Sequence, residues 1–501
     1  MSQALDLSPR PSALLESLRS IGYTLETALA DIFDNSIGAS ASCVSVHFRW
    51  NDGNPWIAVI DDGEGMAADK LVEAMRFGSQ SPVLVRDPDD LGRFGLGLKT
   101  ASISQCRHMT VVTKQRGEVC GCIWDLDLIA KEDSSVWGAS FLDRETAESD
   151  PLRKTLIDQF LDIKKSGTIV LWRNLEIRLS GATAGSSEKG FSEAMDVARH
   201  HLETVFHRFL SPEHGRKAVQ MDFNGSALVA FDPFGRPHLA RQELTSLPII
   251  VQGERIMVQA YVLPHHSKIP KAEYQQFGGV EGYLQNQGFY VYRNRRLIVK
   301  ATWFRLIRKE ELNKLIRVRI DIPNTVDHLW KLDVKKSQAD PPESVRRELR
   351  KVIDKIAGAG RRVYTKRATN LMHRSEVPVW RREVADGQVR YRLNEEHPLL
   401  HEILEEQDKA GQERLKTCFR LIGGSFPTDL HFADAADDDL EFAPGADEQE
   451  SEEIVLQLIR ALRKSGLEGE VLRKQLLKTE TLNASPELIE QLIKQELKNH
   501  G

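Results

Sequence analysis

The stretch from residue 92 to residue 102 reads Gly92-Arg93-Phe94-Gly95-Leu96-Gly97-Leu98-Lys99-Thr100-Ala101-Ser102. A glycine-rich backbone that leads into a helix presents amide donors to an anion, and phosphate is the usual ligand of such a segment. Lys99 can add a positive charge at the same phosphates. The spacing is neither G-x-G-x-x-G after a first strand nor G-x-x-x-x-G-K-[ST], so it argues against both the dinucleotide-binding fold and the P-loop fold. The stretch therefore predicts a phosphate site of a different architecture.

A helix is predicted ahead of this stretch, over residues 24–37, because its apolar positions recur at helical spacing. It carries the sequence Asp31-Ile-Phe-Asp34-Asn35-Ser36, in which Asp31 and Asn35 are four residues apart and therefore share a face. A carboxylate and an amide oxygen one turn apart can hold Mg²⁺ and a water between them. The alternative is a helix with a polar outer face, which this motif taken alone favours.

Two further motifs lie at the ends of predicted strands. Asp61-Asp62-Gly63-Glu64-Gly65-Met66 directly follows one strand, and its glycines permit a tight turn. The carboxylate at the end of that strand can accept a hydrogen bond from an exocyclic amine such as that of adenine. Ser166-Gly167-Thr168-Ile169-Val170 begins another strand, where the hydroxyl of Thr168 can bond the base or a bridging water. Each of these two motifs is also typical of an ordinary turn or strand start.

The order of the predicted elements indicates the fold class. The chain reads helix, strand, strand, helix, loop, helix and then strands, which suggests an α/β sandwich with a largely antiparallel sheet instead of a Rossmann alternation. The elements are helices at 24–37, 67–75 and from 99 onward, a polar loop at 78–90, and strands at 44–50, 56–60, 110–113, 121–126 and 168–172.

In their order and spacing, the four motifs resemble those of the GHKL ATPase superfamily, which includes gyrase-type topoisomerases, MutL, histidine kinases, heat-shock chaperones and MORC proteins. The resemblance implies the Bergerat α/β sandwich, with ATP and Mg²⁺ as cofactors. It also implies a mobile lid at about residues 77–91 and Asn35 as the Mg²⁺ ligand. The nucleotide contacts that it implies are Asp61 for adenine, Gly63, Gly65 and Met66 on the side of the base, Gly92 to Thr100 around the phosphates, and Thr168.

The sequence departs from the family pattern at the position of the general base. Asp31 stands where many relatives carry a glutamate, and aspartate is one methylene shorter. The activation of water by Asp31 is therefore left open, and so is a module that holds ATP but barely turns it over. Glu26 is a possible helper, although a solvated surface role fits it better. Gly38 replaces an acidic residue of the family motif without an obvious chemical cost.

A second region carries a looser resemblance. The segment from Gly288 to Ile298 is similar to the transducer strand of MutL-like and MORC-like proteins. The segment from Leu332 to Ser337 is similar to the stretch from which such transducers extend a lysine to the γ-phosphate. Lys335 and Lys336 point to opposite sides of a strand, so only one of them can act, and Lys336 is slightly favoured. The alternative is two solvated lysines.

Domain boundaries follow from shifts in pattern and composition. An α+β protein is expected, in which a GHKL domain is followed by an S5-like α/β transducer and a small helical tail. The segments are an N-terminal arm at 1–22, the ATP-binding domain at 23–190, the transducer at 191–365, a helical or mixed extension at 366–433, an acidic linker at 434–453 predicted to be disordered, and a helical tail at 454–501.

The charge is distributed unevenly along the 501 residues, whose net charge is −5. Residues 286–374 contain 23 Lys and Arg against 9 Asp and Glu, whereas residues 434–453 contain ten acidic residues and no basic one. The basic surplus fits a surface that faces double-stranded DNA, although solvated helix faces explain many such runs. The arginines proposed for DNA contact are Arg293, Arg295, Arg296, Arg305, Arg308 and Arg317.

Other classes of protein are disfavoured by composition. No apolar run approaches the roughly 18 residues that span a bilayer, and no secretory signal is visible, so we expect a cytoplasmic protein without membrane contact. The five cysteines are too scattered for a disulfide framework, and Cys120 and Cys122 are better explained as strand positions than as a zinc site.

Together these features predict a Mg²⁺-dependent ATPase that acts as an ATP-gated dimeric clamp or conformational switch. The resemblance is greatest to stand-alone bacterial MORC/MutL-type ATPases, which implies DNA as a partner and a role in phage defence or restriction. The N-terminal arm is a candidate for exchange within an ATP-dependent homodimer, and the helical tail is expected to bind protein partners. The alternative is a chaperone-like or scaffold protein that remodels protein partners without contacting DNA. A histidine kinase, a type II topoisomerase and a MutL endonuclease are not expected, because the segments that they require are not visible.

Overall fold

The structure is a computed structural model with two compact units, residues 1–360 and residues 361–501. It describes residues 11–77 except 21, 97–131, 138–176, 187–323 except 214, 237, 240, 245, 252, 266 and 267, then 325–326, 330, 341–356, 377–425 except 386 and 387, 448–479 and 485–499. Several expected site residues lie outside these ranges, namely Gly92, Arg93, Phe94, Gly95, Leu96, Lys335 and Lys336, as do residues 1–10 of the arm and residues 78–91 of the lid.

The helix that carries the first motif is α2, Leu25–Gly38. It begins after Thr24, whose backbone N–H donates to the hydroxyl of Thr27 at 3.1 Å and so satisfies one of the groups that a helix start leaves without a partner. Its buried apolar residues, among them Leu29 and Phe33, recur at helical spacing and hold α2 against the hydrophobic core. This is the helix that the sequence periodicity predicts.

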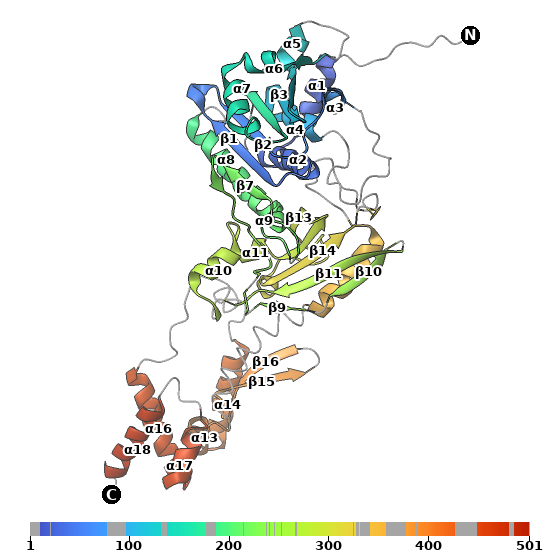
Figure 1. Ribbon diagram of the computed structural model, residues 1–501. Coiled ribbons are helices and arrows are strands. Elements are labelled where there is room, and N and C mark those ends of the chain that lie inside the picture. The colour runs from blue at the N-terminus through green and yellow to red at the C-terminus, as the bar shows by residue number, and fades with distance from the viewer. Residues whose placement is uncertain are drawn as a thin grey trace, which may run out of the picture. The chain divides into compact units, whose positions relative to one another are not determined.

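An eight-stranded sheet forms the body of the first part of unit 1 (Figure 1). Only the β1–β7 pair is parallel among its described pairs, so the sheet is largely antiparallel, as expected. Its order is β5 (Ser140–Leu142), β4 (Glu118–Asp125), β3 (Cys106–Gln115), β6 (Gly167–Leu175), β2 (Trp56–Asp61), β1 (Cys43–Arg49), β7 (Gln220–Phe223) and β8 (Ser226–Ala227).

Strand β2 lies inside this sheet, and its side chains are buried on both faces. Ile57 and Val59 belong to one hydrophobic core, whereas Ala58 and Ile60 belong to the core on the opposite face, as the two-residue period of a strand requires. The helices that cover the two faces complete an α/β sandwich. They are α1 (Pro11–Arg19), α2, α3 (Ala68–Met75), α4 (Gly97–Gln105), α5 (Leu126–Lys131) and α8 (Glu188–Val205) on the first face, and α6 (Arg144–Glu148), α7 (Pro151–Leu156) and η2 (Ile157–Leu161) on the second, with the short turn η1 (Asn51–Gly53) between β1 and β2.

A second sheet follows in the same unit. Its core lies between the strands and a helix at residues 343–356, which contributes Val345, Leu349 and Val352. Strands β12 and β13 form a hairpin whose turn, Asn294–Arg295, has φ values of 47° and 69°, as a two-residue primed turn requires. The sheet order is β10 (Leu247–Val251), β11 (Glu254–Val262), β14 (Ile316–Ile322), β12 (Gly288–Arg293) and β13 (Arg296–Thr302), with β9 (Gln242–Glu243) beside β11. The helices between these strands are α10 (Lys271–Gly278), α11 (Gly282–Gln285) and η5 (Glu311–Asn313), whereas α9 (His207–Leu210) lies between α8 and β7.

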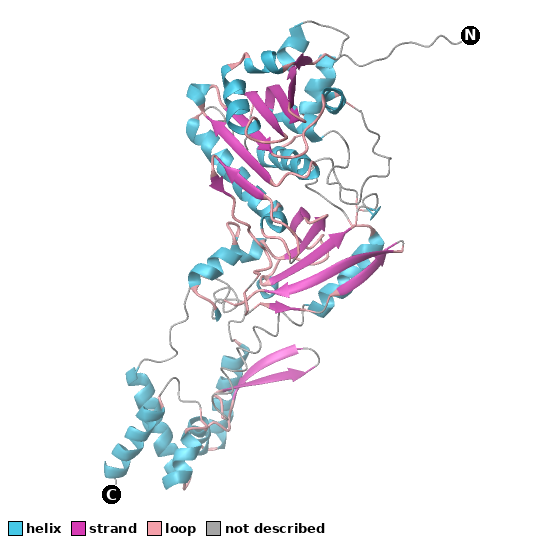
Figure 2. Cartoon of the chain, viewed as in Figure 1, coloured by secondary structure: helices cyan, strands magenta, loops and turns pink. Residues whose placement is uncertain are grey.

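Unit 2 combines a hairpin with helices (Figure 2). Helix α16 begins at Glu448, so the expectation of a disordered acidic linker over 434–453 is wrong for its last six residues. Acidic side chains at a helix N-terminus are favoured by the helix dipole, and the apolar residues that follow position 453 supply a buried face. The elements are β15 (Trp380–Ala385), β16 (Gln388–Leu393), α13 (Pro398–Glu405), α14 (Lys409–Gly424), α16 (Glu448–Lys464), α17 (Gly469–Leu476) and α18 (Pro486–Asn499).

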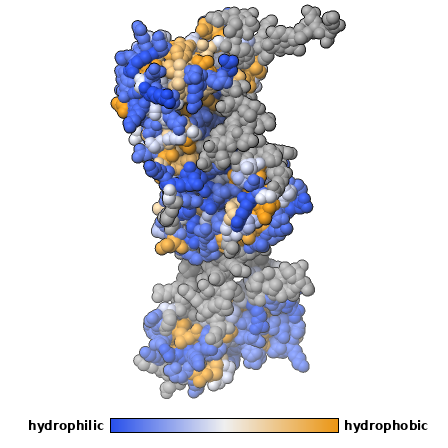
Figure 3. Space-filling view, turned by 45° about the vertical axis from the view of Figure 1, so that its right-hand side comes forward, coloured by the Kyte–Doolittle hydropathy of each residue, from blue (hydrophilic) through white to orange (hydrophobic). Residues whose placement is uncertain are grey.

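Among the described helices, none combines the length and the apolar character that crossing a bilayer requires. The face of the molecule in Figure 3 is mainly hydrophilic, with small hydrophobic areas.

Candidate functional site

The first and third motifs meet at the polar face of α2. Asp31 is buried, and its Oδ2 accepts a hydrogen bond of 2.9 Å from the hydroxyl of Tyr23. Asn35 lies one turn further along the same helix and is exposed. Gly97 begins α4 directly above this face, since a Cβ at Gly97 would lie 3.4 Å from Oδ2 of Asp31. The structure therefore places the end of the glycine-rich stretch beside the acidic helix.

Asp61, the last residue of β2, is held in a fixed orientation. Its carboxylate accepts hydrogen bonds of 2.9 Å from the hydroxyl of Ser36 and from the backbone N–H of Gly63. Burial raises the pKa of Asp61, and the hydrogen bonds from Gly63 and Ser36 oppose that rise. In the β2–β6 ladder Asp61 stands opposite Thr168. The second and fourth motifs are thus adjacent, and each carboxylate oxygen keeps acceptor capacity for a ligand amine.

The turn after β2 has no room for a side chain at its second glycine. Gly65 has φ +65°, and a Cβ there would lie 2.0 Å from the carbonyl oxygen of Lys114. The next residue, Met66, donates its backbone N–H to the hydroxyl of Thr113 at 2.9 Å, and that hydroxyl lies 3.2 Å from the hydroxyl of Thr168. Glycine at position 65 is therefore a steric requirement of the turn.

Three residues of this site were not found from the sequence. Ser36 lies inside a quoted motif but was given no role, and its contact with Asp61 could have been suspected from its place one residue after Asn35. Tyr23 and Thr113 carry no local signal, because each reaches the site from outside the motifs.

The described hydrogen bonds of Lys99 are made with the end of α3. The lysine is buried, and its Nζ donates to the carbonyl oxygens of Ala74 at 2.8 Å and Arg76 at 2.7 Å, at the end of α3. Burial lowers the pKa of Lys99 to about 8, which the charge of Glu73 opposes. These contacts have a local cause, because carbonyls at a helix end lack helical partners and attract a buried cation. The phosphate contact of Lys99 stays a prediction. Its helix neighbours Leu98 and Thr100 are half-buried and buried.

One residue from the second sheet reaches the site. Arg296, at the start of β13, donates from Nε to the two carboxylate oxygens of Asp34 at 3.0 and 3.2 Å. Its Nη2 lies 4.0 Å from Oδ1 of Asp31. All three side chains are buried. The guanidinium of Arg296 thus lies beside the carboxylates of both Asp34 and Asp31, which are on α2 within about one turn of Asn35.

This placement corrects the list of arginines expected at DNA. Arg293, Arg296 and Arg317 are buried and do not reach the surface, whereas Arg305 and Arg308 are exposed. The side chain of Arg317 is enclosed near aromatic rings, with its guanidinium 5.7 Å from the ring centre of Tyr283. A count of basic residues could not separate the buried from the solvated ones.

Polar contacts between α9 and the second sheet also join the two parts of unit 1. His207 is fully buried, its Nε2 lies 2.8 Å from the hydroxyl of Tyr292, and burial lowers the pKa of His207 to about 3. The neighbouring Arg208 donates to Asp321 of β14 at 2.5 Å. The neutral histidine and this ion pair give the junction a defined geometry.

The fold and the convergence of the motifs define a class of protein, and comparison with known families agrees. Residues 23–157 match the family described as "Histidine kinase-, DNA gyrase B-, and HSP90-like ATPase". The resemblance to GHKL ATPases that the motifs indicated is confirmed for this segment.

A more particular likeness is to "ATPase morc-1" of Caenorhabditis elegans. The two sequences are 30% identical over 91 residues, which is 18% of this chain and 10% of that protein. The match supports a MORC-like ATPase domain. Because the chain spans about a tenth of the length of this curated relative, the likeness is limited to that segment.

Proposed function

We propose that the protein is a Mg²⁺-dependent ATPase that works as an ATP-gated conformational switch. The observation that carries the proposal is the convergence of Asp31, Asn35, Asp61 and Gly97 from separate motifs on one side of the sandwich. The residues fit the implied ligands. A buried carboxylate with acceptor capacity suits adenine, a turn at Gly65 that excludes side chains suits a closely packed base, and an exposed amide beside a carboxylate suits Mg²⁺.

Binding of the base depends on Asp61. Its carboxylate accepts the hydrogen bond of the exocyclic amino group, while Ser36 and Gly63 keep it oriented. Thr113 and Thr168 form a hydroxyl pair at the same end of the sheet and position the backbone of Met66. Replacing Asp61 removes the acceptor and leaves the donors of Ser36 and Gly63 without their acceptor in a buried place.

Hydrolysis depends on α2. Asn35 would hold Mg²⁺, which would neutralise charge on the phosphates. Asp31 accepts a proton from the water that attacks the γ-phosphorus, the bond to the ADP oxygen breaks, and ADP and phosphate leave. The Tyr23 hydroxyl on Oδ2 fixes the orientation of the Asp31 carboxylate. Because the side chain is one methylene shorter than glutamate, we expect slow turnover.

A turnover assay tests this assignment. Asp31→Asn should bind ATP as the parent does but release phosphate at least about a hundredfold more slowly, because a general base contributes 10²–10⁴-fold. Asn35→Ala should lose Mg²⁺-dependent binding in calorimetry. Glu145→Gln, an exposed residue of α6 on the opposite face of the sheet, is the control and should retain turnover.

Two other results would change the proposal. Binding without turnover in the parent, with no further loss in Asp31→Asn, would make the protein an ATP-binding module. Calorimetry that detects no Mg²⁺-dependent uptake of adenine nucleotide by the parent would remove the proposal altogether.

The output of the switch is proposed to be an ATP-dependent dimer that clamps DNA in a bacterial defence or restriction system, in the cytoplasm. In it, Lys336 or Lys335 reaches the γ-phosphate, the arm at 1–22 is exchanged between copies, and the C-terminal tail binds protein partners. Light scattering with and without a non-hydrolysable ATP analogue tests the dimer, and an unchanged mass would contradict it.

A switch that acts on protein partners without DNA is the second candidate. It is favoured by the burial of Arg293, Arg296 and Arg317, which removes half of the six arginines proposed for DNA. The exposed basic residues of this region include Arg305, Arg308 and, on the helix at 343–356, Arg347 and Arg350. Stimulation of phosphate release by duplex DNA, with steep loss of binding as salt rises, would favour DNA. No binding at low salt would favour the second candidate.

A further inference from the structure

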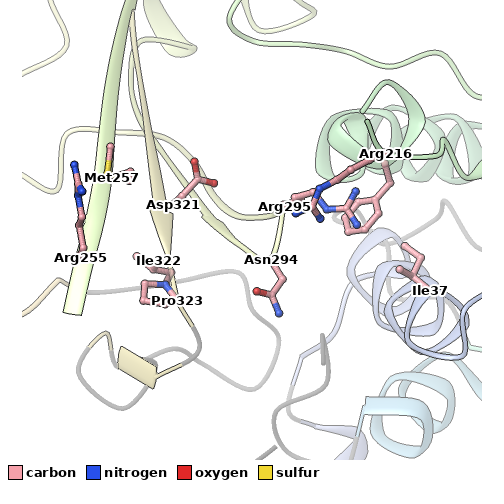
Figure 4. Close-up of a pocket in the computed structure, with 10 residues that line it drawn as sticks. Ile37, Arg216, Arg255, Met257, Asn294, Arg295, Asp321, Ile322 and Pro323 are labelled. Carbon is pink, nitrogen blue, oxygen red and sulfur yellow. The ribbon is translucent and has the colours of Figure 1, made fainter. Parts of the chain in front are cut away.

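A cavity of about 510 Å³ opens between the end of α2, α9 and the second sheet (Figure 4). Its volume lies in the range of small-ligand sites. Three arginines line it, namely Arg216 after α9, Arg255 in β11 and Arg295 in the β12–β13 turn. In Figure 4, Arg216 and Arg295 lie on one side and Arg255 on the other, with Asp321 between them. Guanidinium groups from three separate segments therefore line a single space.

The carboxylate in this cavity already has two other arginine partners. Asp321 is bonded to Arg208 at 2.5 Å and lies 3.0 Å from Nε of Arg319. Within the part of the chain that the structure describes, neither Arg216 nor Arg255 forms an ion pair with a carboxylate. Positive charges held together in a concave site repel one another and attract an anion.

The residues that line the cavity indicate which kind of anion it would bind. Arg295 is fixed in place because its guanidinium lies 4.3 Å from the ring centre of Phe209. Its neighbour in the turn, Asn294, adds an amide to the lining, and both residues have positive φ, which restricts the turn. A guanidinium offers planar, paired donors that match the oxygens of a phosphate. The apolar floor, which includes Met257 and Ile322, suits a ligand with an uncharged body beside its phosphate.

We propose that this cavity, whose lining includes none of Asp31, Asn35, Asp61 and Gly97, is a phosphate-binding site separate from the proposed nucleotide site. Its ligand carries the phosphate either in the backbone of a nucleic acid strand or on a small molecule. Arg216, Arg255 and Arg295 hold the phosphate, and Met257 and Ile322 contact the rest of the ligand. The site does not depend on ATP hydrolysis.

Equilibrium binding of two probes to the full chain tests the proposal. The probes are inorganic pyrophosphate, followed by calorimetry, and a ten-nucleotide fluorescein-labelled single strand, followed by anisotropy. Saturating non-hydrolysable ATP analogue with Mg²⁺ is present throughout, so that the nucleotide site does not take up the probes. Arg216→Ala/Arg255→Ala should raise the Kd of the probe that binds by about tenfold or more, because two charge-assisted contacts are lost. Arg49→Ala/Arg414→Ala removes two exposed arginines elsewhere and should leave the Kd within about twofold.

A second variant leaves all three arginines in place. Met257→Trp enlarges a half-buried side chain of the floor, so it should weaken the same probe by filling the cavity. If the cavity variants lose only the binding of pyrophosphate, the ligand is a small phosphorylated molecule. If they lose only the binding of the single-stranded oligonucleotide, the ligand is the backbone of a nucleic acid. Failure of both probes to bind the parent, or equal binding by the cavity variants and the control, overturns the proposal. Because ATP turnover is measured separately, that outcome leaves the ATPase assignment unaffected.

Discussion

The ion pair between Arg296 and Asp34 is expected to join α2 to the second sheet. The two residues are 262 positions apart in sequence, and their side chains are only 4% and 1% exposed. Removing one partner of a buried pair costs about 3–5 kcal/mol, because the remaining charge loses its nearest opposite charge in a place that water does not reach. We therefore expect Arg296→Ala and Asp34→Ala each to destabilise unit 1 by about 3 kcal/mol or more.

A double-mutant cycle measures this contribution. Urea unfolding of the full chain is followed through its first transition for both single variants and for the double variant. Since the second substitution then removes a charge that has already lost this contact, we expect a coupling energy of about 3 kcal/mol. Lys351 and Glu348 provide the control, because they form a 2.7 Å pair but are 68% and 42% exposed. Their coupling should be about 0.2–1 kcal/mol.

Hydrogen exchange distinguishes loss of this ion pair from a local packing defect. A packing defect would change amide exchange only around the substituted residue. Asp34→Ala should increase amide exchange in the β12–β13 hairpin, and Arg296→Ala should do the same in α2, because each loses its anchor in the other part. Arg296→Lys should restore stability only in part, since an ammonium cannot make the planar, paired contact. A coupling energy below about 1 kcal/mol, or exchange changes confined to the substituted segment, would refute the reasoning.

Three further predictions concern single residues. Asp61→Asn should weaken ATP binding at least about tenfold in calorimetry, because the acceptor for adenine becomes partly a donor, and unchanged affinity would contradict its role. Gly65→Ala should abolish nucleotide binding, because the added Cβ would lie 2.0 Å from the carbonyl oxygen of Lys114. Gly38→Ala is the control and should bind nucleotide normally, because no atom lies within 4 Å of the added Cβ. Burial lowers the pKa of Lys99 to about 8 from the ordinary 10.5, so the unfolded chain binds this proton more tightly and stability rises with pH between these values. The difference in thermal midpoint between the parent and Lys99→Met should therefore shift in favour of the parent from pH 8 to 10.5, and a constant difference would disprove the assignment.

Local features of the site could be predicted because their physical causes are local. The helix over 24–37 follows from apolar spacing, and α2 spans Leu25–Gly38. The turn after β2 follows from its glycines, and Gly65 does adopt a positive φ. The order of the motifs along the chain was enough to indicate a resemblance to GHKL ATPases, which the match confirms for residues 23–157.

Side chains that act across long distances could not be predicted. Arg296 was assigned to DNA on charge alone, yet it is buried against Asp34, and nothing in the sequence indicated the hydrogen bonds of Lys99 to the end of α3. Tyr23 had no local signal for its contact with Asp31.

The sequence by itself determined the elements, the glycine turns and the class of ATPase domain, because periodicity and backbone freedom are properties of neighbouring residues. Only the tertiary structure decided which charges are buried and which partners they meet. The position of a charged residue in the sequence does not show which residue its side chain contacts. That partner depends on the packing of the chain, which removes both side chains from water together.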